Sequence, residues 1–168
     1  PIDLSQRPIL EGELVSVSVQ FEAPAYSYLI ALNPNGKDQL YLPPGQSQPR
    51  SPSAEVRFDD FGFPLTDGPG LQAFVVVASR QPLPPYETWP GTDGLRQRWK
   101  PVAADDLQGV WEYKDGQVRR LSSGARGPLA KRPGAESLAP LRDVCDYLRK
   151  LPDVETVQAI AFPVRPKG

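Results

Sequence analysis

The chain has 168 residues, 19 basic and 20 acidic side chains, one cysteine and no histidine. Without histidine, and with the lone Cys145 unable to form a disulfide or a cysteine-rich metal site, we expect no cofactor and no metal. The formal net charge of −1 argues against nucleic acid as a partner, and no apolar run reaches the roughly 18 residues of a membrane span.

This length predicts a single domain, residues 1–168, with an ordered core from approximately 11 to 164. Its 21 prolines and 14 glycines argue against a helical bundle, because proline interrupts helices, and favour β-structure with long connections. The chain begins at Pro1 and contains no methionine, which suggests a piece of a longer polypeptide. One cysteine leaves the compartment open, with the cytoplasm as the default.

Alternating apolar and polar residues predict a half-buried strand at Glu13–Phe21. The dipeptide Ala23-Pro24 predicts a break, and Tyr26–Leu32 a second strand. The N-P-N-G turn that starts at Asn33 then leads into a short strand at Gln39–Leu42.

A loop rich in proline and glycine follows at Pro43–Pro52, and a short strand near a sheet edge is predicted at Ala54–Phe58. Phe61 and Phe63 are expected to anchor the next loop. Leu71–Ser79 is the most apolar segment of the chain, so we predict a strand at the centre of the sheet with both faces covered.

Asp115-Gly116 lies between two β-prone runs, Gly109–Tyr113 and Gln117–Leu121, and predicts a hairpin. Apolar residues at helical spacing, Cys145 among them, predict an amphipathic helix at Leu138–Leu151, where the cysteine is a buried and inert side chain. A last buried strand is predicted at Thr156–Phe162. Together these elements predict a mainly β fold: an antiparallel β-sandwich or curved sheet of about seven or eight strands with one helix near the C-terminus, α+β overall.

Aromatic and basic residues supply the candidate binding site. The long connection Gln81–Leu107 carries Tyr86, Trp89 and Trp99, which either anchor that loop on the core or form a recognition surface. A locally basic stretch from Lys114 to Arg132 is either a solvated surface or a source of charge selectivity. Our hypothesis is that the aromatic loop binds a protein or peptide and that two arginines of the hairpin, Arg119 and Arg120, select its charge.

Two other classes of function remain open. A hydrolase acting on carbohydrate would need a pair of carboxylates, for which the chain offers Asp59, Asp60, Asp67, Glu87, Asp105, Asp106 and Glu112. A small-molecule carrier would need an apolar cavity inside a closed barrel. A calcium site in the oxygen-rich segment 58–68 is a weaker alternative, because its spacing fits no EF-hand.

Four stretches are familiar together: A-Y-S-Y-L-I-A-L-N-P-N-G-K-D-Q-L-Y-L-P-P from Ala25, G-L-Q-A-F-V-V-V-A-S-R-Q-P-L-P-P-Y from Gly70, V-W-E-Y-K-D-G-Q-V-R-R-L from Val110, and V-Q-A-I-A-F-P-V from Val157. The chain resembles, over about Glu13–Val164, an uncharacterised bacterial domain family. Its members accompany kinase, caspase-like peptidase or helical-repeat regions, notably in planctomycete-like bacteria. The resemblance implies no catalytic motif. We therefore expect a non-enzymatic binding or regulatory module that recognises a protein or peptide. Other domains of its parent chain are among the partners that this expectation covers.

Overall fold

The computed structural model describes residues 7–43, 51–57, 62–89, 98–121 and 138–168. Their strands are β1 (Ile9–Leu10), β2 (Leu14–Val15), β3 (Ser18–Leu32), β4 (Asp38–Leu42), β5 (Ser53–Arg57), β6 (Phe63–Pro64), β7 (Gly70–Ser79), β8 (Val110–Lys114), β9 (Gln117–Leu121) and β10 (Val154–Arg165). Their helices are two 3-10 turns, η1 (Tyr86–Thr88) and η2 (Ala104–Asp106), and the α-helix α2 (Ala139–Arg149).

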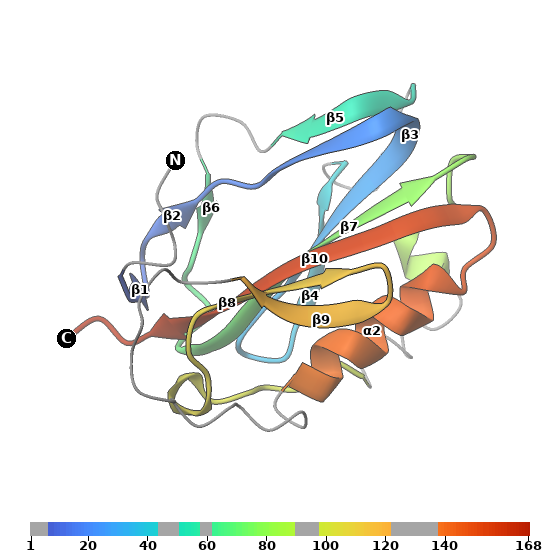
Figure 1. Cartoon of the computed structure of the whole chain (residues 1–168). Helices are drawn as coiled ribbons and strands as arrows, with labels where there is room; N and C mark the ends of the chain where they lie inside the picture. Colours follow the sequence, from blue (N-terminus) through green and yellow to red (C-terminus); the bar gives the residue numbers. More distant parts are fainter. Residues whose placement is uncertain (1–6, 44–50, 58–61, 90–97, 122–137) are drawn as a thin grey trace.

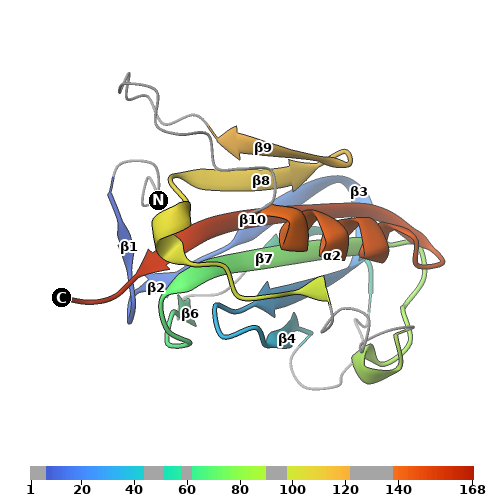
Figure 2. The same ribbon diagram turned by 90° about the horizontal axis from the view of Figure 1, so that it is seen from below.

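Eight of the strands form one curved sheet in the order β4-β3-β7-β10-β8-β9, with β1 beside β10 and β5 beside β3 (Figure 1). Every pairing in it is antiparallel except that of β1 with β10. Strands β2 and β6 form a second, two-stranded sheet. Helix α2 runs across one face of the large sheet (Figure 2). The predicted fold class, mainly β with a helix near the C-terminus, is confirmed.

Strand β7 lies between β3 and β10, and each of its ten residues is buried. Its three consecutive valines face alternate sides of the sheet. Val75 and Val77 belong to the hydrophobic cluster on one side and Val76 to the cluster on the other, so both faces of β7 are covered. The central position predicted from its continuous apolar run is therefore confirmed.

Strand β3 corrects the prediction of two strands separated at Ala23-Pro24. It continues through Pro24 and changes partner, pairing with β5 in its first part and with β7 from Tyr26 onward. Proline is tolerated because the β5 register jumps from Gln20 to Ala25, so Pro24 falls where no ladder hydrogen bond is required of it. The bend carries the first part of β3 away from the plane of the large sheet (Figure 1).

One face of the sheet is covered by α2, which buries Leu141, Val144, Cys145 and Leu148. The cysteine is fully buried, and burial raises the pKa of its thiol well above the ordinary value, in agreement with the inert role predicted for it. No helix in the described ranges has the length and apolar character needed to cross a membrane.

Shorter strands cover the opposite face, where Val15 of β2 and Phe63 of β6 contribute to a second hydrophobic cluster. Partly buried apolar residues of β3, among them Val19, pack against this cluster. Phe61, the other predicted anchor, and Phe58, the predicted end of the edge strand, lie outside the described residues.

Candidate ligand-binding groove

The three aromatic residues of the predicted recognition surface lie in the core. Tyr86, Trp89 and Trp99 expose 8, 3 and 2% of their surfaces, and all belong to the cluster on the α2 side of the sheet. The ring of Trp89 packs edge-to-face on those of Tyr28 and Tyr86, at centroid distances of 5.3 and 5.1 Å. Little of these rings therefore reaches the surface.

Hydrogen bonds hold the same aromatic residues in place. The indole N–H of Trp99 donates to the carbonyl oxygen of Asn33 at 2.8 Å, and that of Trp89 to the carbonyl oxygen of Pro84 at 2.7 Å. The Tyr86 hydroxyl donates to the Asp38 carboxylate at 2.6 Å. These contacts give the aromatic residues the loop-anchoring role that their burial also indicates.

Arg119 and Arg120 are exposed neighbours on β9, and they point to opposite faces of the sheet. Arg119 pairs with Glu112 across the hairpin, on the face opposite α2, whereas Arg120 pairs with Trp111 on the helix side. The buried aromatics belong to the helix-side cluster, so the structure does not gather the five predicted site residues on one exposed surface.

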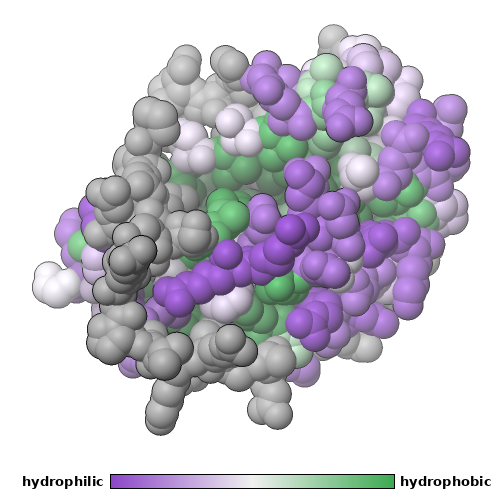
Figure 3. Space-filling view, viewed as in Figure 1, coloured by the Kyte–Doolittle hydropathy of each residue, from purple (hydrophilic) through white to green (hydrophobic). Residues whose placement is uncertain are grey.

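A pocket of about 350 Å³ opens on the face that lacks the helix. Its floor is formed by β7 and β10, its roof by residues 15–19, and its remaining wall by β8 and β9. Its lining includes Val17, Val19, Leu121 and Ile160, four aliphatic residues that are only partly buried. Figure 3 shows hydrophobic surface in this opening, above a hydrophilic band that crosses the molecule.

The curvature of the sheet creates this pocket. After its bend, β3 pairs with β7, whereas its first part pairs with β5 and lies across the sheet face from β8 and β9. Side chains of the two layers meet around Phe63 and Phe74, whose rings lie 5.1 Å apart. Beneath Val17 and Val19 the layers leave unfilled space, and this space is the pocket.

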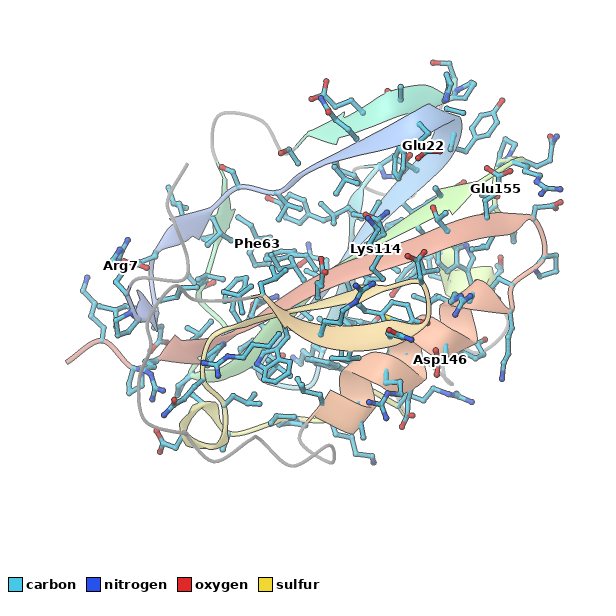
Figure 4. All side chains as sticks on the ribbon, viewed as in Figure 1. Arg7, Glu22, Phe63, Lys114, Asp146 and Glu155 are labelled. Atoms are coloured by element: carbon cyan, nitrogen blue, oxygen red, sulfur yellow. The ribbon has the colours of Figure 1, made fainter. Side chains whose placement is uncertain are left out.

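Polar side chains also line the pocket. Glu112, Lys114 and Gln158 line the pocket, and the exposed Arg119 lies on the same face as Glu112. Figure 4 shows Lys114 extending from the β8–β9 hairpin toward the layer that contains β3. A lining that combines aliphatic and polar side chains is usual for a ligand site.

Two strands that border the pocket are paired on one side only. Within the described part of the chain, β9 pairs with β8 alone, and Ser18–Gln20 of β3 pair with β5 alone. Unpaired strand edges expose main-chain N–H and C=O groups that another extended segment can use. The groove, meaning this pocket together with the free edge of β9, therefore offers both apolar and main-chain contacts.

The carboxylates considered for catalysis are placed separately. Glu112 lines the pocket, Asp67 accepts a hydrogen bond from the Asn35 side chain at 2.9 Å, and Asp105 forms an exposed ion pair with Arg165. Asp59, Asp60 and the side chain of Asp106 lie outside the described residues, as does most of the segment considered for calcium. Among the residues described, no cluster of three or more acidic or cysteine side chains is arranged to hold a metal ion.

No protein-family model, curated protein or solved structure matches this chain. The molecule itself defines a mainly β domain with a groove on the sheet face opposite its helix. Sequence reasoning missed most of the groove, although one signal was present: in Q-V-R-R-L, strand alternation places Arg119 and Leu121 on the same face.

Proposed function

We propose that this protein is a non-catalytic binding domain that takes an extended segment of a protein partner into the groove. The observation that carries this proposal is that the pocket, which has aliphatic residues in its lining, is bordered by strands whose edges are unpaired in the described chain. An extended peptide satisfies both features at once, because its main chain can pair with an edge while alternate side chains enter a pocket.

The rest of the molecule supports a binding role because large side chains of its core are buried and hydrogen-bonded. Trp89, Trp99 and Cys145 are buried, and the two indole N–H groups are hydrogen-bonded. A rigid scaffold that presents one open groove lowers the ordering cost of binding. In keeping with the family resemblance, we propose that the domain acts as an accessory module within a larger bacterial protein.

A displayed library of random peptides, about ten residues long, tests this proposal when it is selected on the immobilised domain. Selected peptides are then titrated into the isotope-labelled domain. Amide shifts should change at Val17, Leu121 and Ile160, and the change should saturate. Shifts confined to α2, or a selection that yields no saturable binder, would contradict the proposal.

The pocket volume favours one second candidate, a carrier of a small apolar molecule. About 350 Å³ lies at the lower end of the roughly 300–1,000 Å³ that small-molecule sites occupy. Native mass spectrometry of the purified domain, followed by competition with a selected peptide, separates the two. A co-purifying apolar compound that displaces the peptide would favour the carrier.

A further inference from the structure

We propose that the segment bound in the groove adds as an antiparallel strand to β9 and contains an apolar residue followed by two acidic residues. This inference rests on the proposed function and specifies the chemistry of the partner. Three observations carry it: the edge of β9 with which no described strand pairs, the charges of the hairpin, and the alternation of its side chains across the sheet.

The main chain of β9 has a defined set of free groups. Asp115 and Gly116 form a two-residue turn with φ values of 53° and 78°, so Lys114 and Gln117 are the hydrogen-bonded pair beside it. Hydrogen-bonded pairs alternate along the ladder. Every second residue of β9 therefore directs its N–H and C=O away from β8, where an added strand can pair with them.

Positive charge surrounds that edge. Lys114, Arg119 and Arg120 are exposed, and no described residue forms an ion pair with any of them. The acidic residues on the same hairpin are Glu112, which faces Arg119, and Asp115 in the turn. The excess of basic side chains favours an acidic segment.

Alternation sets the order of residues in the segment. A residue opposite Leu121 lies on the face of the sheet that bears the pocket, beside Leu121, which lines the pocket. The next residue lies beside Arg120 on the other face, and the one after it beside Arg119. In an antiparallel strand this gives the order apolar, acidic, acidic.

The test uses three synthetic peptides with the same flanking residues and a central leucine followed by two aspartates, two asparagines or two lysines. We expect the aspartate peptide to bind at least about tenfold more tightly than the lysine peptide, and its affinity to fall as salt is added. It should also slow hydrogen exchange of the outward-facing amides of β9.

Charge reversal on the protein tests the strand register. Arg119→Glu and Arg120→Glu should each weaken binding of the aspartate peptide by about fivefold. The same variants should strengthen binding of the lysine peptide by a similar factor. Arg142→Glu on the exposed side of α2 is the matched control and should change affinity less than about twofold. Unfolding midpoints show whether the variants remain folded. Arg119→Gln removes the positive charge without placing a second carboxylate opposite Glu112.

The outcomes separate this inference from the proposed function. If library peptides shift the pocket residues but bind equally well to the Arg120→Glu variant and leave the exchange of the β9 amides unchanged, a peptide occupies the groove without the proposed contacts to β9, and only this inference is overturned. If no peptide shifts the pocket residues, the proposed function itself fails. Equal binding of the aspartate and lysine peptides would also overturn the inference.

Discussion

The hydroxyl of Tyr113 donates a hydrogen bond to the Asp146 carboxylate at 2.6 Å, which joins the β8–β9 hairpin to α2. Asp146 lies on the side of the helix next to that hairpin (Figure 4). A guanidinium nitrogen of Arg149 donates to the same hydroxyl at 3.4 Å. Because the groove uses one face of this hairpin and α2 supports the other, the Tyr113–Asp146 bond helps to fix the edge at which we propose that a partner binds.

Tyr113→Phe should destabilise the domain by about 1.5 kcal/mol, since it removes a hydrogen bond to a charged acceptor while the half-buried Asp146 regains water. Urea unfolding at neutral pH measures this loss. Tyr26→Phe, which changes a partly buried tyrosine elsewhere in the sheet, is a suitable control. A loss in Tyr113→Phe no larger than that of the control would contradict the structural role assigned to this bond.

Stability should fall between pH 10 and about 12. Burial, followed by the hydrogen bond to Asp146, raises the pKa of Tyr113 from 10.0 to about 12. The folded state thus keeps a proton that the unfolded chain loses above pH 10, and the stabilisation present below that pH disappears as the folded pKa is approached. Urea unfolding across this range should show a smaller decline for Tyr113→Phe than for the wild type. Equal declines would indicate that other groups dominate the pH dependence of stability. Tyr28 is one such group, because burial also raises its pKa.

Gly70→Ala should be more damaging than Gly68→Ala. Both glycines have positive φ, 139° and 89°, so each substitution is strained by roughly 1–2 kcal/mol. A Cβ at Gly70 would also lie 3.0 Å from the Val102 carbonyl oxygen and 3.1 Å from Cβ of Pro34, whereas nothing lies within 4 Å of one at Gly68. Thermal unfolding of the two variants compares the costs directly, and similar midpoints would show that the contact beside Gly70 adjusts freely.

Ile160→Phe should block the groove without unfolding the domain. The side chain of Ile160 lines the pocket, where a larger ring occupies free space instead of overpacking a filled core. Binding of library-selected peptides should be lost while the unfolding midpoint stays within a few degrees. Thr156→Phe, an exposed position on the same strand outside the pocket lining, is the matched control and should leave binding intact.

Cys145 should react with a thiol reagent only when the domain opens. Its side chain is fully buried, and its raised pKa leaves almost no thiolate at neutral pH. Labelling under native conditions should therefore be slower than labelling in urea by several orders of magnitude, in line with a marginal but cooperative stability. Rapid native labelling would show that α2 detaches easily from the sheet.

Local patterns in the chain were sufficient for most of the secondary structure. Alternation identified most of the longer strands, the continuous valines of β7 placed it at the centre, and Asp115-Gly116 located the hairpin turn. The two-residue strands β1 and β6 were not predicted, and the strand predicted at Glu13–Phe21 is interrupted between β2 and β3. The helix with Cys145 on its buried side followed from apolar residues at helical spacing. Each of these features depends on residues a few positions apart, so its physical cause is visible in a short window of sequence.

The groove was not predictable in the same way. Strand alternation was enough to separate Arg119 from Arg120, but not to show that Val17 and Val19 lie across the sheet from β8. That arrangement depends on the bend of β3 between Gln20 and Ala25, where the dipeptide Ala23-Pro24 predicts the end of a strand.

The sequence by itself therefore determined most of the longer elements of this protein and its fold class, mainly β with an amphipathic helix near the C-terminus. Only the tertiary structure decided that Tyr86, Trp89 and Trp99 fill the core and that a pocket opens on the other face. The physical reason is that burial and unfilled space arise from contacts between segments distant in the chain, and these contacts are set by how the sheet curves.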